Sequence, residues 1–391
     1  MSALDITRVK LYPVMVRRRT GVANLHVIVR LEAGASQVGW GEMSDLSHLP
    51  MYQFDLAALE QVLNDLLAGQ DARNLARLED RMQRFYPNEG HKYSRSGLVR
   101  QGVDLALHDL VARAEGVPVY ALLGGQVRDR LKVCYPIFRM RGIEEVGPNL
   151  DRVQSAYERG FDLIRVYVGA NEAADRLFCE SFVARFGGKV RIKSLDYSNL
   201  LGWRQCLAQA ERLANVVEFM LVESPAPEND YDGLAEFRRR SRWAVSEHAN
   251  HLDHAWILLH RRCVDILNVA PYVLGGLRAS IRLIALAEAA HASVLLGTTQ
   301  ELDLGTAAVA HLGAVARVLD YPSDNTGPEL YTDSIVKNRV RYEAGFLLVP
   351  DGPGLGLVVD EERLAGMATR ISNPFGADLD AIVDRTPRRG K

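Results

Sequence analysis

Three short apolar runs each end in an acidic residue: Val190–Asp196 (VRIKSLD), Phe219–Glu223 (FMLVE) and Trp243–Glu247 (WAVSE). Amphipathic stretches with apolar residues at three- and four-residue spacing separate them. The acids are 27 residues apart from Asp196 to Glu223 and 24 residues apart from Glu223 to Glu247. This alternation predicts three successive strand–helix units, with one carboxylate at the end of each strand.

The same rhythm continues on both sides of these runs. Expected strand starts lie near Leu131, Ile164, Val190, Glu218, Trp243, Val264, Ser293 and Arg317. A unit of about 25 residues repeated eight times is typical of a βα-barrel. An open doubly wound sheet gives a similar alternation and is the less favoured alternative. The middle of the chain is therefore predicted to be a barrel.

The two ends of the chain follow other patterns. Residues up to about 55 are rich in strand-forming residues, and helical periodicity follows to about Gly124. The tail from Val340 on has turn chemistry and no strand–helix rhythm. The expected domains are an N-terminal α+β cap (1–128), a catalytic barrel (129–325) and a C-terminal segment (326–391) that completes the cap.

Composition narrows the classes of function. The 47 Lys and Arg residues nearly balance the 49 Asp and Glu residues, so neither nucleic acid nor an anionic membrane is the expected partner. The apolar runs are too short for a membrane span, and the N-terminus lacks the pattern of a signal peptide. The four cysteines form no CxxC pair, which indicates reduced thiols and a cytoplasmic protein.

The strand-end carboxylates indicate a metal site. The carboxyl ends of barrel strands meet at one mouth, where the active sites of such barrels lie. Asp196, Glu223 and Glu247 would repel one another there unless a cation lay between them. All-oxygen ligands suit Mg²⁺, with Mn²⁺ as the second possibility. Acids at strand ends can also cap helices or pair with arginines, which stays open as the alternative.

Several longer motifs resemble the enolase superfamily, in its mandelate racemase/muconate lactonizing enzyme family and on the mandelate racemase-like branch. The matching segments are Asp104–Gly125, Asp196–Asn199, Glu223–Pro225 with Asn229–Gly233, Ser246–His248, Val273–Leu277 and Pro350–Gly356. The resemblance implies an α/β fold, a modified TIM (β/α)7β barrel with an α+β capping domain. It also implies Mg²⁺ held by Asp196, Glu223 and Glu247, and removal of the proton α to the carboxylate of a small-molecule substrate.

The acid and base residues depart from that family pattern. Where the second barrel strand usually carries Lys-x-Lys, this chain has Arg165-Val-Tyr167. The usual histidine of the seventh strand is absent from Leu296–Glu301, and the alternative lysine of the sixth strand is absent from Asp265–Ala270. Period two places Arg165 and Tyr167 on one strand face, so Tyr167 is the candidate base and Arg165 its electrostatic partner. A packing role for Tyr167, or a different base, stays open.

Other candidates come from position and resemblance. His248 follows Glu247 and is the expected proton donor, with support of the metal site as the alternative. Glu301 matches a family residue that faces the substrate carboxylate. Arg17 (beside Arg18 and Arg19), His48 and Tyr52 lie on the two loops that the resemblance places over the barrel mouth, where they would bind substrate. The family also implies a homo-oligomer.

One base and one acid suffice for loss of a β-hydroxyl, whereas racemisation needs a proton-transfer group on each face of the α-carbon. The sequence therefore favours a hydro-lyase that dehydrates a sugar acid (an aldonate or aldarate) to a 2-keto-3-deoxy acid. The alternatives are a racemase or epimerase of a 2-hydroxy acid, and a family member that binds metal and carboxylate without proton transfer.

Overall fold

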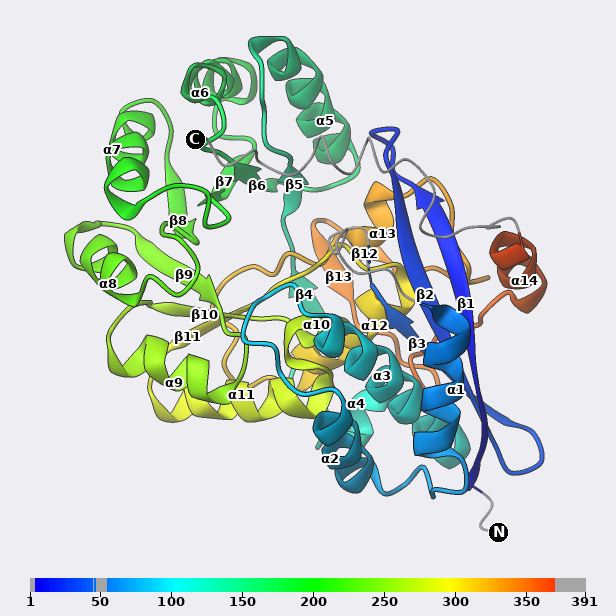
Figure 1. The fold of residues 1–391 in the computed structure, drawn as a ribbon. Coiled ribbons are helices and arrows are strands. Elements are labelled where there is room, and N and C mark those ends of the chain that lie inside the picture. Colours follow the sequence, from blue (N-terminus) through cyan, green and yellow to red (C-terminus); the bar gives the residue numbers. More distant parts are fainter. Residues whose placement is uncertain (1–3, 45, 47–54, 370–391) are drawn as a thin grey trace.

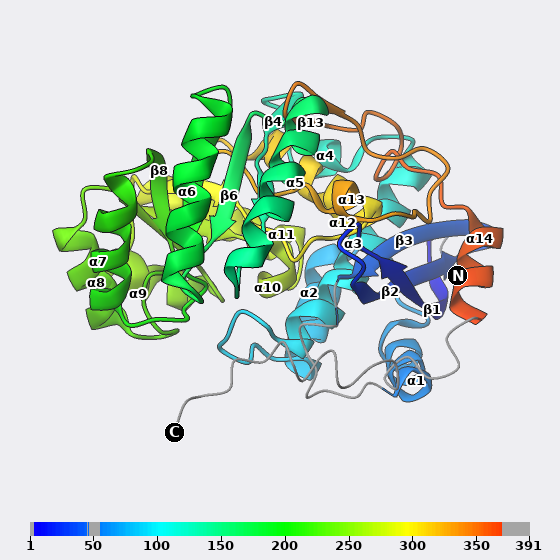
Figure 2. The same ribbon diagram turned by 90° about the horizontal axis from the view of Figure 1, so that it is seen from above.

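The computed structural model describes residues 4–44, 46 and 55–369. Figure 1 shows an antiparallel sheet with its helices beside a parallel sheet with helices outside it. The view in Figure 2 places β1–β3 and α14 on one side and β6–β8 with α6–α8 on the other. Within the described ranges, no helix is both long and apolar enough to cross a membrane.

The cap is built from an antiparallel sheet and helices. Its strands, in the order β1-β2-β3, are β1 (Ile6–Arg17), β2 (Ala23–Ala33) and β3 (Gln37–Met43). Its helices are α1 (Leu56–Leu67), α2 (Leu75–Phe85), α3 (Arg95–Glu115) and α4 (Val119–Leu122). Helix α3 lies close on β3 because Gly41 has no side chain: a Cβ there would stand 2.0 Å from the Gly102 carbonyl oxygen.

Seven parallel strands form the barrel sheet, in the spatial order β11-β10-β9-β8-β7-β6-β5. They are β5 (Tyr135–Ile137), β6 (Leu163–Tyr167), β7 (Arg191–Asp196), β8 (Phe219–Glu223), β9 (Ala244–His248), β10 (Ile266–Val269) and β11 (Ser293–Leu296). The connecting segments contain α5 (Val146–Glu158), α6 (Glu172–Phe186), α7 (Trp203–Ala214), α8 (Tyr231–Arg240), α9 (Leu252–His260), α10 (Pro271–Leu274), α11 (Leu277–Ala289) and α12 (Asp303–Val315). The predicted barrel-type α/β fold with an α+β cap is confirmed.

The predicted strand near Arg317 is wrong. The chain between α12 and α13 (Gly327–Leu330) is irregular instead, and Ser323 forms an isolated parallel bridge with Val133. Cys134 N donates to the Ser323 carbonyl (3.0 Å), and Asp324 N donates to the Leu296 carbonyl (2.9 Å). This segment therefore spans the seam between β5 and β11 and brings Asp324 to the barrel interior.

The expected strand at Leu131 is two strands. Strand β4 (Arg130–Lys132) pairs with β13 (Phe346–Leu348), which pairs with β12 (Tyr342–Glu343), and β5 starts only at Tyr135. Farther on, the C-terminal segment returns to the cap: Leu355 N donates to Asp109 of α3 (2.7 Å). Helix α14 (Glu361–Thr369) then lies beside β1.

Candidate active site

Three acidic residues lie at the carboxyl ends of adjacent barrel strands. Asp196 ends β7 and lies in register with Glu223, which ends β8. Glu223 is in register with Ser246, so Glu247 of β9 is one residue further along. All three are buried, with relative exposures of 3%, 1% and 5% for Asp196, Glu223 and Glu247. The covalent spacing of the strand–helix units thus places one acid at the end of each of three neighbouring strands.

The loops after these strands turn sharply back to the carboxylates. Ser198, Asn199 and Ser224 have positive φ values of 49°, 61° and 50°, in a region that non-glycine residues seldom occupy. Ser198 donates to Asp196 Oδ1 through its backbone N (2.7 Å) and Oγ (3.0 Å). Ser224 Oγ and Asn199 Nδ2 each donate to Glu247 at 2.8 Å. Strained backbone of this kind is typical of functional sites.

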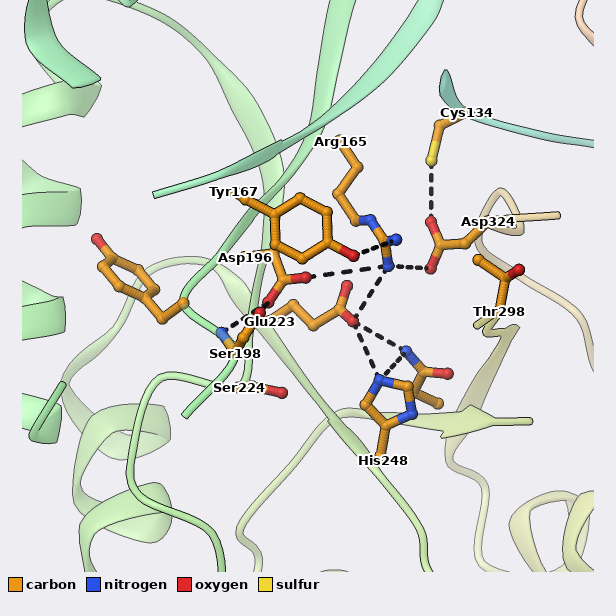
Figure 3. Close-up of polar contacts among 12 residues, drawn as sticks. Cys134, Arg165, Tyr167, Asp196, Ser198, Glu223, Ser224, His248, Thr298 and Asp324 are labelled. Carbon is orange, nitrogen blue, oxygen red and sulfur yellow. Dashed lines mark hydrogen bonds and ion pairs between the residues drawn. The ribbon is translucent and has the colours of Figure 1, made fainter. Parts of the chain in front are cut away.

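Arg165 and Tyr167 both reach the barrel interior from β6 (Figure 3). Arg165 Nη2 donates to the Tyr167 hydroxyl at 2.6 Å. Its Nη1 lies 3.6 Å from Glu223 Oε1 and 3.9 Å from Asp196 Oδ2. The Tyr167 ring stacks on Phe138, with centroids 5.8 Å apart. The guanidinium therefore stands between the predicted base and two of the predicted metal ligands.

Asp324, which the sequence analysis did not single out, anchors this guanidinium. Arg165 Nη1 donates to Asp324 Oδ2 at 3.1 Å, and Lys193 Nζ and Cys134 Sγ donate to Oδ1. Burial alone would raise the pKa of Asp324, but the charges of Arg165 and Lys193 bring it below its usual value. Lys193, inside a predicted barrel strand, was the available signal for a buried acid, because a buried ammonium needs a partner.

The pKa shifts describe the site without a bound ion. Burial raises the pKa of Asp196 and Glu223, and for Asp196 the neighbouring Glu223 charge adds to the effect. Burial also raises the pKa of Tyr167 well above its usual value, while Arg165 acts in the opposite direction. The Tyr167 hydroxyl is thus a protonated phenol in this arrangement, and Arg165 is the group that favours its ionisation.

His248 lies next to the carboxylates. Its Nε2 is 3.5 Å from Glu223 Oε1 and 3.4 Å from Asn268 Nδ2, and Asn268 Nδ2 also donates to Glu223 Oε1 at 3.0 Å. Burial first, and then the Lys92 charge, lower the pKa of His248 to about 4. The imidazole is therefore neutral near pH 7.

The donor set suits a hard cation, although the site is not a closed cage. In the part of the chain that the structure describes, no three His, Cys, Asp or Glu side chains are arranged as a formed metal site. Glu223 Oε2, however, is buried and has no hydrogen-bond partner among the described residues, and carboxylate oxygens are the ligands that Mg²⁺ prefers. Asp196, Glu223 and Glu247 are the residues that could hold the ion, with Arg165 supplying positive charge beside two of them.

Lys92 is a second residue that the sequence analysis missed. It lies between α2 and α3, is only 6% exposed, and its Nζ donates to Asn199 Oδ1. Asn199 in turn donates to Glu247. No periodic pattern marked Lys92, because it belongs to an irregular connection of the cap.

The predicted substrate-binding residues are not all gathered at this site. Glu301 is buried, and Thr298 Oγ1 and Thr299 N donate to its carboxylate, so it is held within its own loop. Arg17 is exposed, and its Nη1 donates to the Gly21 carbonyl at 2.8 Å, within the β1–β2 turn. His48 and Tyr52 lie outside the described residues.

Arg18 lies closer to the barrel mouth than Arg17. Its guanidinium stands over the rings of Phe138 and Tyr331, 5.5 and 5.7 Å from their centroids. Phe138 is the ring that stacks on Tyr167. Phe138 therefore connects the Arg18 guanidinium to the ring of Tyr167.

Family models match most of the chain. Residues 3–124 match the mandelate racemase/muconate lactonizing enzyme N-terminal domain, and residues 150–363 match the enolase C-terminal domain-like family. A chloromuconate cycloisomerase from Pseudomonas putida is 26% identical over 93% of this chain and 98% of its own. An L-Ala-D/L-Glu epimerase from Bacillus subtilis is 25% identical over 85% and 88%.

A solved structure shows the same fold. The muconate lactonizing enzyme from Pseudomonas fluorescens, complexed with muconolactone, superposes with a TM-score of 0.83 at 24% identity, over 93% of this chain and 99% of its own. The family matches agree with the cap and the barrel described above. The chain belongs to the mandelate racemase/muconate lactonizing enzyme family of the enolase superfamily.

Proposed function

We propose that this protein removes the proton α to the carboxylate of a small organic acid and that the overall reaction is an isomerisation. The observation that carries the proposal is the hydrogen bond from Arg165 Nη2 to the Tyr167 hydroxyl, 2.6 Å long, beside three strand-end carboxylates. The curated relatives include cycloisomerases and an epimerase, which favours an isomerase over a lyase.

The proposal includes Mg²⁺, with Mn²⁺ as the alternative, held by Asp196, Glu223 and Glu247. When bound, such an ion supplies positive charge that stabilises the negative charge developing on the substrate carboxylate. Because Arg165 is already 3.6 Å from Glu223, it contributes fixed positive charge to the same region. Arginine keeps its proton at every pH relevant to an enzyme, so this contribution is permanent.

Tyr167 is the proposed base. Abstraction of the α-proton requires its phenolate, and burial opposes that form. The donated hydrogen bond from Arg165 favours it, because the guanidinium interacts more strongly with a phenolate than with a phenol. The stacked Phe138 keeps the ring in place while the proton moves. A single proton-transfer group is sufficient for a cycloisomerisation, whereas an epimerisation needs a second one, for which His248 is the candidate.

Dehydration of a sugar acid is the second candidate function. It is favoured by His248, whose Nε2 is 3.5 Å from Glu223 Oε1. A proton carrier in that position could protonate a leaving hydroxyl on the β-carbon. The neutral imidazole would then have to donate its single ring proton.

The test is a panel of acids incubated in D₂O with Mg²⁺ and followed by NMR. The panel contains dienoic diacids and their lactones, dipeptides, 2-hydroxy acids and aldonates. An isomerised or α-deuterated product supports the proposal, and a 2-keto-3-deoxy product supports the second candidate. A protein that binds Mg²⁺ but gives neither deuterium exchange nor product with any acid would contradict both.

A further inference from the structure

The connection between α2 and α3 carries a lysine from the cap to the barrel mouth. Figure 1 shows this connection reaching from the cap helices across to the barrel strands. Asn88 Nδ2 donates to the Asn250 carbonyl at 2.8 Å, and Lys92 N donates to Glu228 Oε1 at 2.9 Å. These bonds link the segment to the loops that follow β8 and β9, so Lys92 is held in place at the mouth.

The side chain of Lys92 is linked to the carboxylate of Glu247 through the amide of Asn199. Its Nζ donates to Asn199 Oδ1, and Asn199 Nδ2 donates to Glu247 Oε2 at 2.8 Å. Burial would lower the pKa of this ammonium group. The pKa is nevertheless raised by the surroundings, first by Tyr93 and then by the charges of Glu247 and Asp196. The Lys92 side chain is therefore a positively charged ammonium group. Besides Tyr93, the neighbouring charges that act on it are those of carboxylates.

Positive charge reaches the three carboxylates from two directions. Arg165 approaches Asp196 and Glu223 from inside the barrel, at 3.9 and 3.6 Å. Lys92 approaches from the cap, on the side of Glu247, through Asn199. Without such charges the three acids would repel one another or take up protons.

We propose that Lys92 is a tethered counter-ion of the carboxylate site: its ammonium group compensates Glu247 and Asp196 when no divalent cation is bound, and an incoming cation competes with it. The second half of this inference rests on the metal site of the proposed function. Since two ligands that compete for one site are linked reciprocally, divalent cation binding weakens the attachment of the α2–α3 connection to the mouth.

Magnesium titration provides the first test, with calorimetry on wild type and on the Lys92→Met, Lys92→Arg and Lys132→Met proteins. We expect Lys92→Met to bind Mg²⁺ about tenfold more tightly than wild type, because a competing charge is gone. Lys92→Arg keeps the charge and should remain close to wild type. Lys132 forms its ion pair with Asp162, so Lys132→Met controls for loss of a lysine elsewhere. If Lys92→Met binds Mg²⁺ as tightly as wild type or more weakly, then Lys92 does not compete with the cation.

The second test needs no metal and separates this inference from the proposed function. Urea unfolding in EDTA is measured for wild type, Lys92→Met, Glu247→Gln and the double variant. We expect Lys92→Met to increase the unfolding equilibrium constant about tenfold more in wild type than in the Glu247→Gln background, because the charge that Lys92 compensates is then absent. Equal effects in both backgrounds would refute the counter-ion role. If Lys92 and Glu247 are coupled in this experiment but the protein binds no Mg²⁺, the counter-ion role of Lys92 stands and the metal site of the proposed function is refuted.

Discussion

The guanidinium of Arg165 joins the hydroxyl of Tyr167 to the carboxylate of Asp324. Nη2 donates to Tyr167 at 2.6 Å, and Nη1 donates to Asp324 at 3.1 Å. One end of the planar group is therefore fixed by an ion pair, so the other end is aimed at the proposed base. In the proposed function this arrangement takes the place of the family lysine, since a tyrosine needs a neighbouring cation to act as a base near neutral pH.

Tyr167→Phe removes the hydroxyl and keeps the ring that stacks on Phe138. We expect α-deuterium exchange into a confirmed substrate to fall by about 10² to 10⁴, the usual contribution of a general base. Mg²⁺ binding and folding should persist. Tyr157→Phe, which alters a partly exposed tyrosine of α5, is the matched control. Undiminished exchange in the Tyr167→Phe protein would show that this ring is only a wall of the site.

Asp324→Asn should release Arg165 and leave Lys193 without its carboxylate. Breaking a buried ion pair at one partner costs about 3 to 5 kcal/mol of unfolding free energy. We expect a loss of that order in urea denaturation, together with slower exchange at saturating substrate. Cys134→Ser keeps a donor to the same carboxylate and should be milder in both measurements. A wild-type rate of α-deuterium exchange in Asp324→Asn would show that the ion pair between Asp324 and Arg165 is not needed for catalysis.

The strand-end acids could be predicted because their placement follows from local order. Each strand–helix unit advances the chain by one strand, so acids spaced by one unit arrive at the same mouth, as Asp196, Glu223 and Glu247 do. Period two likewise predicts that Arg165 and Tyr167 share a strand face.

Asp324 and Lys92 could not be found in this way. Asp324 lies in an irregular segment whose position depends on closure of the seam between β5 and β11, through the Ser323–Val133 bridge. Lys92 lies in an irregular connection that is placed by hydrogen bonds to distant loops. In both cases tertiary contacts decide the position, and no periodicity in the sequence encodes those contacts.

Mg²⁺ should raise the melting temperature, and EDTA should lower it, because a ligand that binds only the folded protein stabilises it. A concentration of 100 times Kd corresponds to about 2.7 kcal/mol of stabilisation. Glu223→Gln should lose this response, since it changes the carboxylate whose buried Oε2 accepts no hydrogen bond from the part of the chain that the structure describes. Glu288→Gln, on the exposed face of α11, should keep it. A wild-type protein that shows no response to Mg²⁺ or Mn²⁺ would contradict the metal assignment.

His311 predicts an acid-dependent loss of stability. Burial within α12 lowers the pKa of His311 to about 4, whereas an unfolded histidine has a pKa of about 6.5. A lowered folded pKa contributes stability that is present above the unfolded pKa and is lost as pH falls through the range between the two values. From pH 7 to pH 5 this loss is about 2 kcal/mol. Over that pH range, we expect the free energy of unfolding of His311→Leu to fall by about 2 kcal/mol less than that of wild type, as measured by urea denaturation. An equal fall in both proteins would contradict a lowered pKa of His311.

His248→Asn distinguishes an isomerisation that uses Tyr167 alone from a dehydration. The neutral imidazole of His248, with a pKa lowered to about 4 chiefly by burial, can donate a ring proton but holds no extra one near pH 7. If the reaction is an isomerisation in which Tyr167 alone moves the proton, His248→Asn should leave both exchange and product formation within about tenfold of wild type. If the reaction is a dehydration, the leaving hydroxyl loses its donor. Formation of the 2-keto product should then fall by about 10² or more while α-deuterium exchange continues.

Both rates are measured in one NMR experiment in D₂O at saturating Mg²⁺, with calorimetric Mg²⁺ binding as the control for the ligand set. Equal loss of both rates together with loss of Mg²⁺ binding would show that His248, 3.5 Å from Glu223, supports the carboxylates instead of the substrate.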